Sequence, residues 1–244
     1  MGTSKYGVDF FQDDFLEREV ATLLERAKKP AKSSLFKNVV DPYAILFEAA
    51  ASGTKISEWR VLEKSRQANK MLANAIGDFH QALLGNLPGW SSTGKVGGGL
   101  DLIHAEPFGT RQTPCFAEVK NKYNTMNSDG ILAVFSKFQK FLSMPGYKHY
   151  TCYLVQVIQK RPQNDVPWKI SQRGEQENIR IISAPYVYQL STGDPQAFSK
   201  TLQAILQILQ DQHGLDYDGD DSREIEEILT KTPGFRINHP KEQR

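Results

Sequence analysis

Apolar residues in the first third of the chain recur every three or four positions, as on one face of an amphipathic helix. Two such stripes predict a first and a third helix: Phe11, Phe15, Leu16 and Leu23, then Met71, Leu72, Ala75, Ile76, Phe79 and Leu83. Between them, Asp41-Pro42 is typical of a helix start, because Asp caps free amides and Pro fits the first helical position. This second helix is expected to end near Ser52-Gly53, and the third to begin at Ser57-Glu58.

Beyond residue 90 the pattern changes to short β-type runs. Strands are predicted at Leu100–His104, Cys115–Lys120, Tyr150–Ile158 and Ile179–Ser183. The Tyr150–Ile158 run is mostly apolar, which indicates a strand that is buried on both faces. Helical spacing returns over Ser128–Met144 and again after Asp194-Pro195. The predicted order is helices followed by β-β-α-β-β-α, an α/β fold with a mixed central sheet flanked by helices.

The length suits one domain. We expect a single domain over residues 1–244, with a helical N-terminal part (about 1–90) and an α/β core (about 91–212) that carries the chemistry. Hydrophobic residues make up 39% and charged residues 24% of the chain, which excludes disorder over most of its length. Neither a run of 18 apolar residues nor an N-terminal apolar signal region is present, so a soluble cytoplasmic protein without a membrane span is expected. Cys115 and Cys152 form no disulfide framework and are interpreted as core residues.

The net charge of +2 conceals an uneven distribution. Residues 111–148 hold six Lys or Arg against two acids, whereas residues 211–228 hold eight acids against one Arg. Opposite regional charges cancel in the sum, yet they can leave one strongly positive face. Such a face would suit a polyanionic partner.

Two of the predicted strands carry charged residues inside apolar runs. Asp101 lies in Leu100–His104, and Glu118 and Lys120 follow 17 and 19 positions later in Cys115–Lys120. Because alternate residues of a strand face the same side, Glu118 and Lys120 should point together, away from Val119. If the two runs pair, Asp101 can join them. Two carboxylates and an ammonium would then meet at one sheet edge.

This combination suits the cleavage of a phosphodiester. A hard cation polarises the phosphate and activates a water molecule, and Mg²⁺ takes oxygen ligands that usually include one or two carboxylates. A neighbouring ammonium can orient the water or stabilise charge on the phosphorane. The non-catalytic alternative is a surface ion pair between two ordinary strands, and such pairs contribute little to stability.

The spacing resembles the PD-(D/E)XK nuclease superfamily, with Leu100 where the superfamily label has Pro. The string from Glu118 to Asn127, Glu-Val-Lys-Asn-Lys-Tyr-Asn-Thr-Met-Asn, looks like type II restriction endonucleases, in particular a group that cuts GGNCC-type sites. The segments Ile76–Gln81 and Thr192–Asp194 also resemble that group. The resemblance covers roughly residues 55–210 and implies a PD-(D/E)XK fold core. It implies that Asp101 and Glu118 are Mg²⁺ ligands and that Lys120 is the catalytic lysine.

Further residues are candidates for supporting roles. Asn121, Lys122, Tyr123, Asn124 and Thr125 are predicted to form a loop that contacts DNA, although a plain polar loop is the alternative. Nucleases of this type often take an extra carboxylate from an upstream helix, for which Glu63 is chosen although a solvated acid is the simpler interpretation. His80 and Asp78 are interpreted as parts of the core helix, and His104 is expected near the site but is not needed for the chemistry.

The acidic segment from Asp216 faintly imitates a calcium-binding EF-hand loop, with Glu227 at its twelfth position. Its sixth position is Asp221, where the turn of that loop requires Gly. A solvated acidic loop that leads into a short helix is therefore the preferred interpretation.

Three functional hypotheses follow. The first is a type II restriction endonuclease that cuts a short palindromic site, GGNCC or GGWCC, in double-stranded DNA as a homodimer beside a companion DNA methyltransferase. The second is another nuclease of the superfamily, for repair or junction resolution. The third is a non-catalytic DNA-binding protein. Candidate guanine-contacting residues for the first hypothesis are Arg111, Lys122, Lys169, Arg173 and Arg180.

Overall fold

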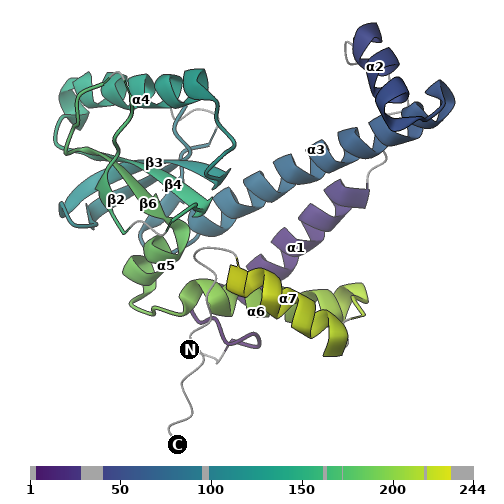
Figure 1. The fold of residues 1–244 in the computed structure, drawn as a ribbon. Coiled ribbons are helices and arrows are strands. Elements are labelled where there is room, and N and C mark those ends of the chain that lie inside the picture. The colour runs from purple at the N-terminus through teal and green to yellow at the C-terminus, as the bar shows by residue number, and fades with distance from the viewer. Residues whose placement is uncertain are drawn as a thin grey trace, which may run out of the picture. The chain divides into compact units, whose positions relative to one another are not determined.

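The computed structural model describes residues 4–28, 41–94, 99–161, 164–171, 173–216 and 219–231 (Figure 1). The chain divides into two compact units, Arg18–Phe79 and the pair of segments Met1–Glu17 and His80–Arg244. The boundaries fall within α1 (Asp13–Lys28) and α3 (Ile56–Leu84). The expectation of a single domain stays a prediction.

The unit Arg18–Phe79 is helical and contains α2 (Pro42–Ser52) besides parts of α1 and α3. Asp41 caps α2, since its side chain accepts a hydrogen bond of 2.9 Å from the amide of Tyr43. Gly53 ends α2 at a left-handed φ of 65°. The helix start and stop predicted from Asp41-Pro42 and Ser52-Gly53 are therefore confirmed.

The other unit contains a six-stranded mixed sheet in the order β1-β2-β3-β4-β6-β5. Its strands are β1 (Trp90–Ser92), β2 (Leu102–Phe108), β3 (Thr113–Lys122), β4 (Thr151–Ile158), β5 (Val166–Pro167) and β6 (Ile179–Ser183). The pairs β1–β2, β2–β3 and β5–β6 are antiparallel, whereas β3–β4 and β4–β6 are parallel. Its helices are the remainder of α1 and α3, then α4 (Ser128–Ser143), the 3₁₀ helix η2 (Pro145–Tyr147), α5 (Ala184–Thr192), α6 (Ala197–His213) and α7 (Gly219–Lys231).

Helices cover both faces of the sheet, with α4 over one face and α5 near the other (Figure 1). Under α4, Phe135 and Phe138 pack with Phe116, Leu154 and Ile181 of the strands. The central strand β4 is buried along almost its whole length, as its apolar sequence predicts. The predicted α/β fold with a mixed sheet flanked by helices is confirmed.

Short elements escaped the sequence analysis. Strands β1 and β5 have three and two residues, too few for a periodic pattern. Helix α5 follows β6 directly, and its cap Ser183 is also the last residue of that strand. Helix α6 begins at Ala197 and not at Asp194-Pro195. Asp194 lies ahead of the helix and accepts hydrogen bonds from the amide of Gln196 and from the ammonium of Lys200 in the first turn of α6.

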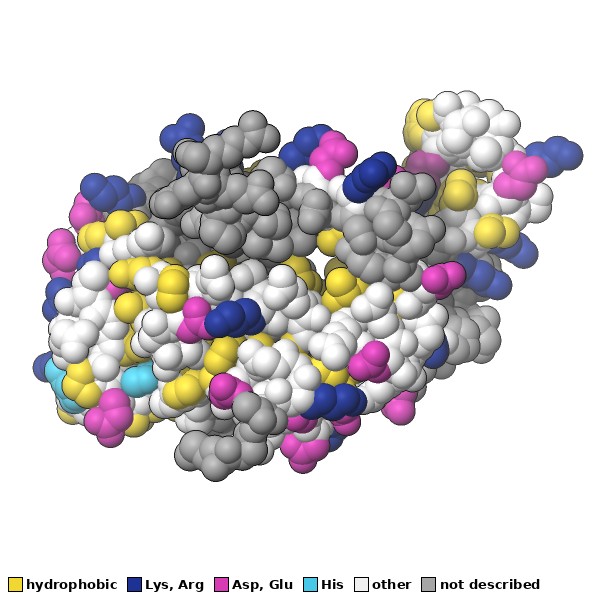
Figure 2. Space-filling view, turned by 90° about the horizontal axis from the view of Figure 1, so that it is seen from below, with side chains coloured by type: hydrophobic (Ala, Val, Ile, Leu, Met, Phe, Trp, Pro, Cys, Tyr) yellow, Lys and Arg dark blue, Asp and Glu magenta, His cyan; other side chains and the backbone are white. Residues whose placement is uncertain are grey.

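The remaining expectations concern the surface and the C-terminal segment. On the face drawn in Figure 2, the Lys and Arg side chains of the described residues lie among Asp and Glu, and the predicted positive face stays a prediction. No helix among the described residues is long and apolar enough to cross a membrane. Of the acidic loop, Tyr217 and Asp218 lie outside the described residues.

Candidate active site

Asp101 stands immediately before β2, where backbone bonds hold it on both sides. Its amide donates to the carbonyl of Ala117 at 3.0 Å, and its carbonyl accepts from the amide of Thr93 at 3.1 Å. Leu102 pairs with Ala117 across the antiparallel β2–β3 ladder, and one step further along this register places Asp101 opposite Glu118. The side chain is also fixed, because Oδ2 accepts a 2.7 Å hydrogen bond from the amide of Val119.

Glu118 and Lys120 project from the same side of β3, as their spacing predicts. Lys120 Nζ donates to Glu118 Oε1 at 2.8 Å, and a second ammonium, Lys137 Nζ of α4, donates to Glu118 Oε2 at 2.6 Å. Val119, between Glu118 and Lys120, is buried. The two predicted runs do pair, so Asp101, Glu118 and Lys120 are neighbours at one place in the fold.

The two carboxylates have different surroundings. Burial raises the pKa of Asp101, as does the nearby charge of Glu118, while the Val119 amide, Lys120 and Lys137 oppose that rise. The Glu118 side chain is only 9% exposed, and each of its oxygens accepts a bond from a lysine. A carboxylate so deeply placed needs this compensation, because a buried unpaired charge is strongly unfavourable. The Glu118–Lys120 pair therefore differs from the exposed surface ion pair that was the non-catalytic alternative.

The donor set fits a hard divalent cation. Asp101 and Glu118 supply carboxylate oxygens side by side, and Mg²⁺ typically takes one or two carboxylates and completes its shell with water and phosphate oxygens. Among the described residues, no three His, Cys, Asp or Glu side chains converge on one point. Two carboxylates suit a magnesium site, in which the remaining positions belong to water and phosphate oxygens.

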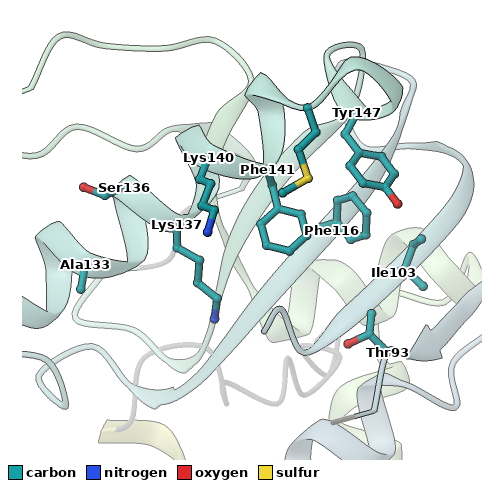
Figure 3. Close-up of a pocket in the computed structure, with 10 residues that line it drawn as sticks. Thr93, Ile103, Phe116, Ala133, Ser136, Lys137, Lys140, Phe141 and Tyr147 are labelled. Atoms are coloured by element: carbon teal, nitrogen blue, oxygen red, sulfur yellow. The ribbon is translucent and has the colours of Figure 1, made fainter. Parts of the chain in front are cut away.

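A cavity of about 800 Å³ opens beside these residues, between α4 and the strands (Figure 3). Lys137 and Lys140 approach it from α4, and Phe116, Phe141 and Tyr147 form its aromatic side. Lys137 lines this cavity and also contacts Glu118. The cavity therefore adjoins the carboxylates.

The segment predicted to contact DNA follows directly from the site. Asn121 and Lys122 are the last residues of β3, and Tyr123, Asn124 and Thr125 form an exposed turn. The turn is held by the Tyr123 amide, which donates to the Ile158 carbonyl at 2.9 Å, and by the Thr125 hydroxyl, which donates to the Lys122 carbonyl. By the alternation of β3, Asn121 belongs to the face opposite Lys120 and Lys122, and its Oδ1 is buried without a hydrogen-bond partner. Its contact with DNA stays a prediction.

The other acids and histidines occupy varied settings. Glu63 lies on α3 in the unit Arg18–Phe79, where it bonds to Arg66 and Gln67. Asp78 pairs with Arg26 at 2.7 Å and is 60% exposed, so it is not a core residue. His104 is 8% exposed; it packs against Trp90 and Phe108 and bonds to the Glu106 carbonyl. That packing gives His104 a structural place in the fold.

Arg180 corrects one expectation from the sequence. It was a candidate for contact with guanine, yet its side chain is 7% exposed and its guanidinium binds the buried carboxylate of Asp165. Thr110 donates to the same carboxylate through its amide at 2.6 Å and its hydroxyl at 2.8 Å. A guanidinium enclosed in this way is not available to a base edge. Arg111, Lys122, Lys169 and Arg173 are exposed.

Two residues near the site were not predicted from the sequence. Lys137 lies among the apolar residues of α4, and its contact with Glu118 depends on how the helix packs on the sheet. Gln156 is paired with Lys120 in the parallel β3–β4 register and is 8% exposed. A buried polar residue within the apolar run of β4 is the one sequence signal that could have identified Gln156.

Comparison with known proteins places this sequence in a family. The sequence profile described as Eco47II restriction endonuclease matches residues 8–213. The type II restriction enzyme Eco47II of Escherichia coli is 34% identical over 210 residues, which cover 81% of this chain and 84% of that enzyme. The chain belongs to the Eco47II restriction endonuclease family. The type II restriction enzyme Sau96I of Staphylococcus aureus is 26% identical over 213 residues, 81% of this chain and 77% of that enzyme.

Membership in the Eco47II family decides between the three functional hypotheses. The chain is a type II restriction endonuclease, a site-specific deoxyribonuclease that acts on DNA, as the first hypothesis predicts. The resemblance stated from Asp101 and the string Glu118–Asn127 is thereby confirmed. The matched segment, residues 8–213, includes every residue of the candidate active site.

Proposed function

We propose that this restriction endonuclease cleaves both strands of a short palindromic DNA site by Mg²⁺-dependent hydrolysis, with Asp101 and Glu118 as cation ligands and Lys120 as the catalytic lysine. One observation carries the proposal. The carboxylate of Asp101, fixed on the Val119 amide at 2.7 Å, lies beside the Glu118–Lys120 pair, whose atoms are 2.8 Å apart. These groups stand on paired strands of a rigid sheet, which suits a site that must hold a phosphate in one geometry.

The reaction is a displacement at phosphorus. The oxygen of a water molecule loses a proton and forms a bond to phosphorus, the bond from phosphorus to one sugar oxygen breaks, and that sugar oxygen takes up a proton. A cation bound at Asp101 and Glu118 would supply Lewis acidity and lower the pKa of the attacking water. The Lys120 ammonium holds a proton beside the reacting group and stabilises the negative charge that develops on the phosphate oxygens.

The loop after β3 supports DNA contact beside this chemistry. Lys122 is exposed and is two residues from Lys120 on the same strand, so the alternation of the strand gives both side chains the same face. A lysine there suits a backbone phosphate, while Asn124 and Tyr123 are exposed in the turn that follows. We assign the loop Asn121–Thr125 to DNA binding on this basis.

Glu63 is proposed as an additional carboxylate from the helical unit. Its present partners, Arg66 at 3.3 Å and Gln67 at 3.0 Å, are those of a partly exposed surface acid. Glu63→Gln tests its role. If Glu63 supports the metal, the variant should need a higher Mg²⁺ concentration than the wild type for half-maximal cleavage. If Glu63 is only a surface acid, that concentration should be unchanged.

Homodimer formation, a GGNCC or GGWCC site and a companion methyltransferase complete the proposal. A two-fold protein matches a two-fold site, so each copy would cut one strand. The specificity rests on the resemblance of the Glu118–Asn127 string to enzymes that cut GGNCC-type sites. An enzyme with this activity would also cut the DNA of its own cell in the cytoplasm, so a methyltransferase of matching specificity is expected to protect those sites.

The test is a digest of plasmid DNA of known sequence with Mg²⁺, followed by sequencing of the ends. Ends flanked by GG and CC support the specificity, other fixed sequences contradict it, and random ends contradict site-specific cleavage.

Glu118→Gln and Asp101→Asn should abolish cutting, since each removes a charged oxygen ligand while it keeps the side-chain shape. Glu106→Gln, an exposed acid on the neighbouring strand β2, is the matched control. If Glu118→Gln cuts at the wild-type rate, Glu118 has no place in the site.

A further inference from the structure

Lys137 is the one group of α4 that reaches the candidate active site through an ion pair. Its ammonium lies 2.6 Å from Glu118 Oε2, the oxygen that Lys120 does not occupy. The side chain is 29% exposed and lines the cavity beside α4 (Figure 3). Both oxygens of Glu118 are thus engaged by ammonium groups, one from its own strand and one from the helix above it.

The tip of Lys137 also meets the chain that leads to Asp101. Gly99, two residues ahead of Asp101, has a φ of 97°, and a Cβ atom there would lie 3.4 Å from Lys137 Cε. Glycine is the residue that adopts this conformation without strain. Lys137 is therefore bonded to Glu118 and lies close to the backbone before Asp101, and its charge also lowers the pKa of Asp101 against the effect of burial.

A positive charge in this position has a consequence for cation binding. The Glu118 oxygen that Lys137 holds is one that a divalent cation would need as a ligand, and an ammonium and Mg²⁺ repel one another at this range. A cation must therefore displace the lysine from Glu118 or accept a weaker ligand. The same lysine compensates the charge of a carboxylate that is only 9% exposed.

We propose that Lys137 is a positioning residue that acts as an internal counterion: it holds Glu118 in place in the metal-free enzyme and competes with the divalent cation for Glu118 Oε2. This inference rests on the proposed function, because it takes Glu118 as a metal ligand. It assigns Lys137 a role that is separate from that of Lys120. The lysine is displaced toward the cavity when the cation binds.

The experiment measures Mg²⁺ binding without DNA, by isothermal titration calorimetry of the full chain. Lys137→Met should bind Mg²⁺ at least tenfold more tightly than the wild type, because the competing charge is gone while the apolar stem is kept. Lys137→Arg should return Kd to within threefold of the wild-type value. Lys140→Met, which removes a lysine that lines the same cavity, is the matched control and should leave Kd unchanged.

Thermal unfolding provides a second readout that does not depend on cleavage. Lys137→Met should lower the Tm of the metal-free protein, and Mg²⁺ should raise Tm by more in this variant than in the wild type, because tighter binding stabilises the folded state further. An equal Kd for Lys137→Met and the wild type overturns the inference and leaves the proposed function standing. If the Glu118→Gln change in the Lys137→Met background leaves Mg²⁺ binding intact, or if neither the wild type nor Lys137→Met binds Mg²⁺, the proposed metal site fails and the inference fails with it.

Discussion

At the scale of single residues, the properties of the Glu118 carboxylate depend on its burial and on the two lysines that bond to it. The same carboxylate on an exposed strand would be an ordinary surface charge. Here its side chain is 9% exposed, and two lysines bond to its two oxygens. These two partners offset the free energy needed to bury the charge of Glu118.

Lys120 is expected to act on the rate of cleavage more than on DNA binding. In the proposed mechanism, Lys120→Met removes the ammonium beside the reacting phosphate, and the loss of one such charge-stabilising donor typically costs about 100- to 1000-fold in kcat. The control is Lys122→Met, a lysine two residues further along the same strand, which should raise KM and change kcat little. Single-turnover cleavage of a duplex separates the two. A Lys120→Met enzyme with wild-type kcat would exclude Lys120 from catalysis.

His80 predicts how stability depends on pH. Burial lowers its pKa to about 4, against an ordinary value of 6.5 in the unfolded chain. Between these values the unfolded chain binds a proton that the folded chain does not, so stability rises with pH in this range and is lost as pH falls from about 6.5 to 4. Integrated over the shift, the loss is about 3 kcal/mol.

Urea unfolding at pH 7.5 and pH 4.5 measures this difference. His80→Gln should reduce the loss of stability between the two pH values, because a neutral amide takes up no proton in either state. His149→Gln, which replaces an exposed histidine, is the control and should leave the loss at its wild-type size. An undiminished loss in His80→Gln would assign the acid sensitivity to other groups.

At the scale of elements, β3 carries Glu118 and Lys120 of the candidate active site, and its neighbours place further residues beside them. The antiparallel partner β2 begins directly after Asp101, and the parallel partner β4 places Gln156 level with Lys120. Helix α4 packs its aromatic face on the same side of the sheet and adds Lys137. The site is thus assembled from two strand ends and one helix, each held by the apolar core beneath it.

The ion pair between β6 and the segment before β5 is expected to be structural. Burial alone would raise the pKa of Asp165, but hydrogen bonds from Thr110 and the Arg180 guanidinium outweigh it and lower this pKa. Arg180→Met leaves the buried carboxylate without its cation, so it should reduce the free energy of unfolding by about 3–5 kcal/mol. Glu177→Gln changes an exposed partner of the same arginine and should cost about 0.5 kcal/mol or less.

Urea unfolding of the two variants, together with the cleavage pattern of whatever folded enzyme remains, distinguishes a structural Arg180 from one that contacts DNA. Loss of stability with an unchanged recognition sequence is the expected result. Wild-type stability combined with a relaxed recognition sequence would instead return Arg180 to the DNA-contacting residues.

At the scale of the whole molecule, the proposed two-fold arrangement predicts the stoichiometry on DNA. Glu118→Gln keeps the shape of the site and should permit binding without cutting. Sedimentation of this variant with a duplex that contains one recognition site should give two chains per duplex. A complex with one chain per duplex, together with a wild-type enzyme that only nicks DNA, would contradict the dimer.

Local chemistry explains why much of the fold follows from the sequence alone. The cap Asp41-Pro42, the apolar stripe of α3 and the mostly apolar run of β4 each act through near neighbours in the chain, so each is visible as a pattern. The pairing of Glu118 with Lys120 is equally local, because alternate residues of a strand must share a face. Asp101 joined them in the prediction because a charge in an apolar run is unusual.

Tertiary structure alone decided the groups that meet across long separations. Lys137 bonds to Glu118 because α4 crosses that face of the sheet, and Arg180 is enclosed because Thr110 and Asp165 close around it from other segments. The sequence does not distinguish a charged residue that is exposed to solvent from one that is paired with a buried partner in another segment. The sequence therefore determined the longer elements, the family and the candidate carboxylates and lysine, while packing determined which other charges lie beside the candidate site and which are enclosed elsewhere in the fold.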